Sequence, residues 1–308
     1  MNRPRTLGIA AITATSLLWG TTGTAATFAP HAGPLAIGSA ALGIGGLLQA
    51  LIALPSLAAA LSRLRRNLPP VAVGALAVGV YPLAFYASMH LAGVAVGTVV
   101  SLASAPLASG LLELAVQRRP PNRWWTLAAT LGTAGGALLC AATMAGPSGA
   151  PPHTATGIAL GLVAGAAYAT FSWTAHSLMG RGVDRAAAMG AVFGTGGILL
   201  MPVLALTGAP LLASAQAFTV AAYMALVPMF LGYLLFGFGL ARVPASTATT
   251  VTLSEPALAA LLAVLVVGES LSAAGWLGLG LVALVPALLA LAPDRAAGTP
   301  VPAGREAV

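Results

Sequence analysis

The sequence predicts an all-α integral membrane protein with ten transmembrane helices, arranged as two inverted five-helix repeats with both termini in the cytoplasm. Three observations support this prediction. The 308-residue chain is 58% hydrophobic and only 6% charged, whereas a soluble domain has about 25% charged residues. Its thirteen basic residues are all arginines, and they fall only at the chain ends or in every second segment between apolar stretches. The sequence also repeats weakly, about 150 residues apart.

Ten apolar stretches are each long enough to cross a bilayer, whose core is spanned by about 20 apolar residues of helix. Their continuous apolarity excludes a membrane β-barrel, in which polar and apolar residues alternate. The N-terminal stretch imitates a signal peptide, but it is long enough to span and we expect it to be retained. The stretches are 7–29, 34–54, 70–90, 94–115, 124–144, 156–178, 187–207, 215–237, 244–267 and 272–292.

The arginines predict the topology, because positive charge is retained on the cytoplasmic side of an inserting membrane protein. Their alternation places both termini inside the cell and the protein in the cell membrane. The net charge of +7 is spread over short segments, so we expect contact with anionic lipid headgroups and not with nucleic acid. The arginines are Arg3, Arg5, Arg63, Arg65, Arg66, Arg118, Arg119, Arg123, Arg181, Arg185, Arg242, Arg295 and Arg305.

The repeat divides the chain into a first unit, 1–150, and a second unit, 151–295, followed by a tail, 296–308, that we expect to be disordered in the cytoplasm. Five spans in each unit place the second repeat upside down relative to the first. Transporters use such inverted repeats to enclose a site near the middle of the bilayer. The matching positions include Trp19 with Tyr168, Ser104 with Ser254, and Pro106 with Pro256.

With these features the chain resembles the EamA-type drug/metabolite transporter superfamily over roughly residues 7–292. The resemblance implies ten helices, export of small metabolites such as amino acids, and a central cavity lined by the first four helices of each half. The first half departs from the pattern, because Ala105 stands at the counterpart of Glu255 and Arg119 at that of Glu269. The motifs that carry the resemblance are Trp19-Gly20, the run Ala245–Thr249, Leu253-Ser254-Glu255-Pro256, and Gly268-Glu269.

Glu255 is the sharpest candidate for the mechanism, because it lies near the middle of the ninth stretch. An ionisable group at that depth costs several kcal/mol unless it faces the bundle interior, finds a partner or takes up a proton. It is therefore either a proton-coupling group, a counter-ion for a substrate amine, or a protonated structural carboxyl bonded to Thr252 or to a backbone carbonyl.

Pro106 and Pro256 lie in the middle of the fourth and ninth stretches. Each removes a backbone amide donor, which makes these positions either hinges or simple kinks. Trp19 lies at the centre of its span, away from the interfacial belts where tryptophan is usual. Trp19 and its repeat mate Tyr168 are thus either a cavity wall or gate, or ordinary core aromatics.

Polar residues recur on single faces of two other stretches. Tyr168, Ser172 and His176 follow one another every four residues, and so do Tyr86 and His90, so each set lies on one face of its helix. Such faces avoid lipid and favour a cavity. Each histidine is either a proton relay or a neutral, hydrogen-bonded group.

The function that these features favour is a secondary transporter, most simply an exporter of small amphipathic metabolites such as amino acids, amines or drugs by alternating access. An integral membrane enzyme and a non-transporting structural or signalling protein are the alternatives. The sequence lacks a metal-binding, nucleophile or phosphate-loop motif, so we expect no catalytic group, metal or cofactor. We expect a monomer or a homodimer, the latter through the small-residue face Ala128-Gly132-Gly136. The sequence alone does not determine the substrate, the direction of transport or whether transport is coupled to protons.

Overall fold

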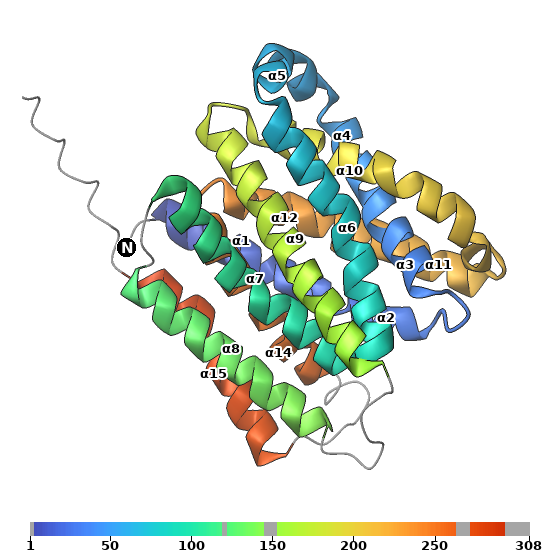
Figure 1. Cartoon of the computed structure of the whole chain (residues 1–308), viewed down its shortest axis with the longest axis vertical. Helices are drawn as coiled ribbons and strands as arrows, with labels where there is room; N and C mark the ends of the chain where they lie inside the picture. The colour runs from blue at the N-terminus through green and yellow to red at the C-terminus, as the bar shows by residue number, and fades with distance from the viewer. Residues whose placement is uncertain (1–2, 119–121, 145–152, 263–271, 293–308) are drawn as a thin grey trace, which may run out of the picture.

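The computed structural model describes residues 3–118, 122–144, 153–262 and 272–292 (Figure 1). This part of the chain is almost entirely helical and contains no β-strand. Two π-helical segments, η1 (Ser39–Ile44) and η3 (Ala225–Leu231), join α3 to α4 and α11 to α12, and a 3₁₀ turn, η2, covers Ala209–Leu212. The α-helices are α1 Arg3–Trp19, α2 Thr22–Thr27, α3 Pro34–Gly38, α4 Gly45–Ile52, α5 Leu54–Arg66, α6 Leu68–Ala92, α7 Val94–Gln117, α8 Arg123–Met144, α9 Thr154–Gly180, α10 Arg185–Thr207, α11 Ala215–Met224, α12 Gly232–Leu240, α13 Ala245–Val251, α14 Ser254–Leu262 and α15 Ala273–Leu291.

The all-α prediction is confirmed for the described residues. The count of ten crossings stays a prediction. Three predicted stretches, the first, fifth and ninth, hold helices that are not among the seven candidate spans given below: α1–α2, α8 and α13–α14. The predicted tail 296–308 lies outside the described residues. Seven helical runs are long and apolar enough to cross a membrane, which indicates a multi-pass membrane protein: Pro34–Ile52, Leu68–Ala92, Val96–Val116, Thr154–Gly180, Arg185–Thr207, Ala215–Leu240 and Ala273–Leu291.

Two predicted stretches are interrupted near their centres. α1 ends at Trp19 and α2 starts at Thr22, where the Thr22 hydroxyl donates to the Trp19 carbonyl oxygen at 2.7 Å. α13 ends at Val251 and α14 starts at Ser254, whose hydroxyl donates to the Val251 carbonyl oxygen at 2.8 Å. Serine and threonine side chains compete in this way with the helical backbone, so hydroxyl-rich sequence produces the breaks.

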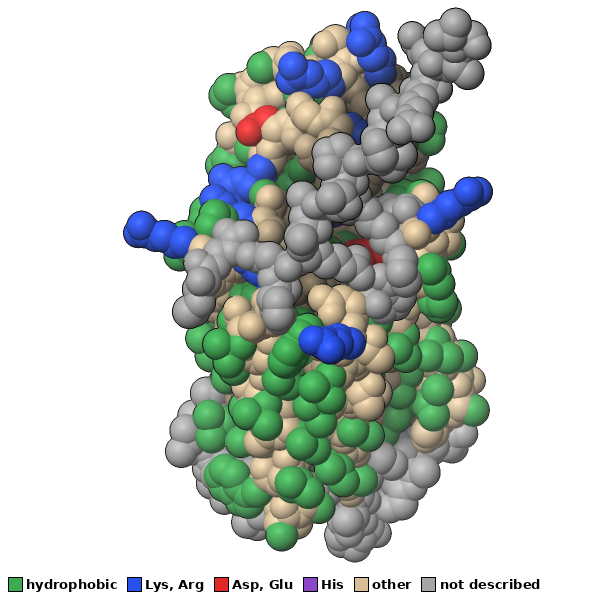
Figure 2. Space-filling view, turned by 90° about the vertical axis from the view of Figure 1, so that its left-hand side faces the viewer, with side chains coloured by type: hydrophobic (Ala, Val, Ile, Leu, Met, Phe, Trp, Pro, Cys, Tyr) green, Lys and Arg blue, Asp and Glu red, His purple; other side chains and the backbone are tan. Residues whose placement is uncertain are grey.

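The ends of the helices that carry arginine meet on one face of the molecule (Figure 2). Because helix ends far apart in the sequence share this face, the structure agrees with the arginine alternation seen in the sequence. Three contacts join these ends: Arg5 donates to the carbonyl oxygen of Ala292, Arg181 donates to Asn67 Oδ1 at 2.8 Å, and Arg185 and Arg242 both lie against the Phe238 ring.

Close packing in the bundle depends on small residues. On α9, Gly157, Gly161 and Gly165 follow one another every four residues and face α6 and α7. A Cβ on Gly157 would lie 2.5 Å from the Ala92 Cβ, and one on Gly165 would lie 2.5 Å from the Ser101 carbonyl oxygen. Such small-residue faces let helix backbones approach closely in membranes, and here they join α9 to its neighbours.

The small-residue face of α8, suggested above as a dimer contact, is used within the chain. Ala128 is fully buried, and a Cβ on Gly132 would lie 2.5 Å from Leu253 Cδ1 and 3.2 Å from Val285 Cγ2. This part of α8 therefore packs against α15 and the α13–α14 break. It is not free to join a second copy.

Candidate functional site

Glu255 lies in the first turn of α14, directly after the break that follows α13. Its side chain is only 5% exposed, and Oε2 has no hydrogen-bond partner among the described residues. A helix start is a favourable place for a carboxylate, because free backbone amides and the helix dipole point toward it. The break therefore places an under-coordinated carboxyl inside the bundle.

The carboxyl borders a closed cavity of about 10 Å³, which is near the smallest space that holds one water molecule. Its wall comes from both halves of the chain, so the site lies between them. A metabolite is too large for this space as it stands. The lining residues are Trp19, Thr22, Ala41, Leu42, Tyr81, Pro82, Phe85, Tyr86, Met229, Tyr233 and Glu255.

Aromatic rings surround this cavity in two related pairs. The ring of Trp19 lies 4.8 Å from that of Tyr233, and the ring of Tyr168 lies 5.6 Å from that of Tyr81. Trp19 and Tyr168 also meet edge to face at 6.0 Å. The two positions matched in the sequence repeat are thus in contact at the centre of the bundle.

Two hydrogen bonds fix the central aromatics. Trp19 Nε1 donates to the Pro228 carbonyl oxygen at 2.9 Å, and the Tyr168 hydroxyl lies 3.0 Å from Thr252 Oγ1. The Thr252 hydroxyl donates to the Thr249 carbonyl oxygen, and no hydrogen bond joins it to the Glu255 carboxyl among the described contacts.

The structure brings five of the predicted site residues together: Trp19, Tyr86, Tyr168, Thr252 and Glu255. The Tyr86 hydroxyl is buried beside the cavity and, like Glu255 Oε2, has no partner among the described residues. Two orphaned polar atoms in one cavity wall are costly in an apolar interior.

Three other predicted residues lie apart from the cavity. His90 is exposed near the end of α6, and Ser172 is buried on α9 without a partner for its hydroxyl among the described residues. His176 Nδ1 lies 2.8 Å from the Leu240 carbonyl oxygen. A carbonyl oxygen only accepts, so Nδ1 carries a proton, and this ring links α9 to the end of α12.

The two prolines are not equivalent in the structure. Pro106 lies inside the continuous helix α7, whereas Pro256 occupies the first turn of α14. Proline is tolerated in a first turn, because the amide there lacks a helical partner. Of the two, Pro256 is the one beside a break in the chain and beside Glu255.

Sequence reasoning did not single out Tyr81 or Tyr233, although both line the cavity. Tyr233 is fully buried, and its ring contacts that of Trp19 at a tilt of 52°. The sequence feature that could have marked them is the scarcity of tyrosine, since the chain has only five. A tyrosine far from both ends of an apolar stretch needs a polar neighbour inside the bundle.

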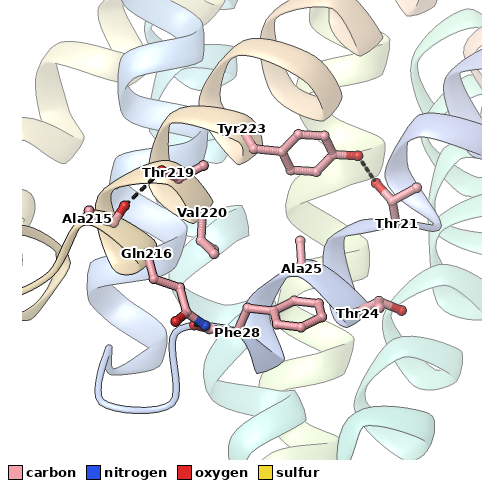
Figure 3. Close-up of a pocket in the computed structure, with 9 residues that line it drawn as sticks. All are labelled: Thr21, Thr24, Ala25, Phe28, Ala215, Gln216, Thr219, Val220 and Tyr223. Carbon is pink, nitrogen blue, oxygen red and sulfur yellow. Dashed lines mark hydrogen bonds between the residues drawn. The ribbon is translucent and has the colours of Figure 1, made fainter. Parts of the chain in front are cut away.

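A second, larger hollow lies between α2 and α11 (Figure 3). These helices follow the far ends of α1 and α10, whose first turns carry Arg5 and Arg185, so the hollow lies away from the arginines. Its volume is about 610 Å³. The Thr21 and Tyr223 hydroxyls, 2.8 Å apart, close one end, and Gln216 Nε2 donates to the Phe28 carbonyl oxygen at 3.0 Å at the other. We call it the α2–α11 groove; its walls are Thr21, Thr24, Ala25, Phe28, Ala215, Gln216, Thr219, Val220 and Tyr223.

Comparison with known proteins agrees with this architecture. Residues 155–291 match the EamA-like transporter family. YwfM of Bacillus subtilis (strain 168), described as an uncharacterized transporter, is 34% identical over 282 residues, which cover 91% of this chain and 92% of that protein. The chain belongs to the EamA-type drug/metabolite transporter superfamily. A protein of known crystal structure shares the fold of this EamA transporter, with a TM-score of 0.70 and 19% identity over 90% of this chain and 94% of the other.

Proposed function

We propose that this EamA transporter exports small amphipathic metabolites, such as amino acids or related amines, across the cell membrane by alternating access through the Glu255 cavity. The observation that carries the proposal is the under-coordinated carboxyl of Glu255 in a closed aromatic cavity beside a broken helix. Transporters build substrate and ion sites at discontinuous helices near the middle of the bilayer.

The pattern of helix contacts supports two inverted repeats. From the first half, α1 packs against α12 of the second half. Its counterpart in the second half, α9, packs against α6 of the first half, which is the counterpart of the α11–α12 run. Likewise α1 contacts α13 and α14, while α9 contacts α7. Exchanging the halves leaves this set of contacts unchanged, as a pseudo-two-fold axis requires.

The lining of the cavity favours a molecule with an apolar body and an amine. Aromatic faces attract ammonium groups, and the carboxyl of Glu255 supplies the matching charge. No lysine or arginine is among the residues that line the cavity. This selects against phosphate groups, which need a cation in the site.

Glu255→Gln tests the role of the carboxyl, because the amide keeps its size and hydrogen bonding but cannot titrate. We expect purified Glu255→Gln in lipid vesicles to lose the acceleration of phenethylamine and L-leucine transport by a pH gradient. If the carboxylate pairs with the amine directly, affinity for phenethylamine also falls about tenfold or more.

The matched control is Glu113→Gln, since Glu113 is held by the Ser246 backbone amide and hydroxyl at the arginine face. It should keep the pH response. Wild-type rate, affinity and pH dependence in Glu255→Gln would remove Glu255 from the mechanism.

The arginine face supports a cytoplasmic location for both termini. In a Cys140→Ser background, Ser214→Cys at the start of α11 should react with an impermeant maleimide added outside cells. Ser62→Cys beside Arg63 should react only after the cells are opened. The opposite labelling pattern would reverse the proposed orientation.

A further inference from the structure

The α2–α11 groove and the Glu255 cavity are separated by a single turn of the first predicted span. Thr21 lines the groove, and its neighbour Thr22 lines the cavity. This turn is the break between α1 and α2. In this turn the Thr21 amide bonds to the Leu18 carbonyl oxygen at 3.3 Å, three residues back instead of four. Such an irregular turn is a place where a local change of shape can occur.

The opposite wall is irregular at the same level. Tyr223 lines the groove and Met229 lines the cavity, and the π-helical segment η3 lies between α11 and α12 here. Trp19 Nε1 reaches across to the Pro228 carbonyl oxygen of η3 at 2.9 Å. π-Helical segments are rare and are concentrated at functional sites.

Trp19 packs closely against the opposite wall between the two spaces. A Cβ on Gly232 would lie 2.8 Å from Trp19 Nε1, so only glycine leaves room for the indole. The Thr15 hydroxyl adds a second link from α1, to the Gly232 carbonyl oxygen at 3.1 Å. Beyond Trp19, the Thr21–Tyr223 contact is a further link between the walls.

We propose that the α2–α11 groove is a second binding site for the transported molecule, on the face away from the arginines, and that Trp19 with η3 forms the gate between this site and the Glu255 cavity. The inference rests on the proposed transport function. It assigns the groove to a molecule with an apolar body and an uncharged or singly charged hydrogen-bonding group.

The chemistry of the walls favours this occupant over a lipid tail. Hydroxyl or amide groups line both walls, from Thr21 on one side and from Gln216, Thr219 and Tyr223 on the other (Figure 3). These groups now bond to one another or to the backbone. They can exchange those bonds for bonds to a polar ligand, whereas an acyl chain offers none. The volume of about 610 Å³ also falls within the range of about 300–1,000 Å³ found for small-molecule pockets.

Filling the groove tests the proposal. Thr219 is exposed within the groove, and its hydroxyl bonds only to its own helix, at the Ala215 carbonyl oxygen. Thr219→Trp should lower the rate of phenethylamine transport in vesicles at least tenfold. The matched control is Phe218→Trp, because Phe218 is exposed on the same helix and does not line the groove.

Labelling provides a second measurement that does not depend on the tryptophan variant folding. In a Cys140→Ser background, phenethylamine should slow the reaction of Thr219→Cys with N-ethylmaleimide several-fold. It should leave Phe218→Cys unaffected. Normal transport by Thr219→Trp, while Glu255→Gln is impaired, would overturn the groove site and leave the proposed function standing. Protection by longer lipid acyl chains, and not by phenethylamine, would also overturn it.

Discussion

The pair formed by α6 and α9 stays in contact along its length, whereas its repeat counterpart, α1–α2 with α11–α12, separates at the end away from the arginines. Both helices of the first pair are continuous. In the second pair, the α1–α2 stretch is broken after Trp19 and the α11–α12 stretch contains η3. Equivalent places in the two repeats therefore hold a continuous pair and an interrupted one. We call them the rigid and the flexible pair, because the proposed function predicts that the cavity opens at the interrupted pair while the continuous pair stays fixed.

The difference has a physical cause in the residues at each interface. Between α6 and α9, glycine lets the backbones touch: a Cβ on Gly74 would lie 2.4 Å from Thr174 Oγ1, and one on Gly161 would lie 3.0 Å from Ser88 Oγ. Between α2 and α11, the Thr21–Tyr223 and Gln216–Phe28 hydrogen bonds bridge a hollow. The many close contacts between α6 and α9 resist separation of these helices. The two hydrogen bonds between α2 and α11 can be replaced by hydrogen bonds to a ligand.

The largest expected effect comes from breaking the rigid pair. Gly157→Leu places a side chain where even a Cβ would lie 2.7 Å from the Ala92 amide nitrogen. Overpacking of this kind costs about 3 kcal/mol or more, so we expect little folded protein after purification. The amount of folded protein and its unfolding temperature are measured by thermal unfolding followed by size-exclusion chromatography in detergent.

Gly280→Leu is the control, because a Cβ there meets nothing within 4 Å. It should unfold at the wild-type temperature. Equal stability of the two variants would show that α6 and α9 do not depend on this contact.

A smaller effect is expected from loosening the flexible pair. Trp19→Phe keeps an aromatic ring but removes the donor to the Pro228 carbonyl oxygen. Losing one hydrogen bond of about 1 kcal/mol favours the open form about fivefold. Labelling of Thr22→Cys by an impermeant reagent from outside should therefore become several-fold faster in the Cys140→Ser background.

Tyr168→Phe is the comparison on the rigid side. It removes the hydrogen bond to Thr252 but leaves α9 packed against α6. We expect no change in the labelling of Thr22→Cys. If Tyr168→Phe accelerated labelling as much as Trp19→Phe, both walls would be equally mobile.

The smallest effect concerns one hydrogen bond in the rigid pair. The Ser88 hydroxyl donates across the interface to the Gly157 carbonyl oxygen at 2.7 Å. Such bonds in membranes are worth about 0.6 kcal/mol, so Ser88→Ala should lower the unfolding temperature slightly. Ser101→Ala should not, since the equally buried Ser101 hydroxyl bonds only to Gly97 in its own helix.

Much of the architecture was predictable, because hydropathy and arginine placement record where each helix begins and ends. Residues gathered around Glu255 were also predictable, since a polar or aromatic group deep in an apolar span must face the interior. The break after Trp19 and the π-helical turn at Pro228 were not. Apolar periodicity reports which face is buried, but it is nearly the same for intact and broken helices.

The histidines show a second limit of sequence patterns. His176 shares a helix face with Tyr168, but spacing does not tell how far a cavity extends along that face, and His176 binds the Leu240 carbonyl instead. Tyr233 shows the converse, because nothing in its local sequence marks it as a neighbour of Trp19. Such contacts depend on how distant helices cross.

Because Glu255 is the one acidic residue among those that line the cavity, a single turnover has one place for positive charge. In the proposed function a proton and an amine cannot occupy that place together, so their movements would be exchanged one for one. Exchange of one proton for one monovalent cation holds the cation gradient to about tenfold for each pH unit across the membrane. Under this proposal the transporter would export its substrate against gradients no steeper than that, and a steeper gradient would need a second acid, for example at Ala105, the repeat counterpart of Glu255.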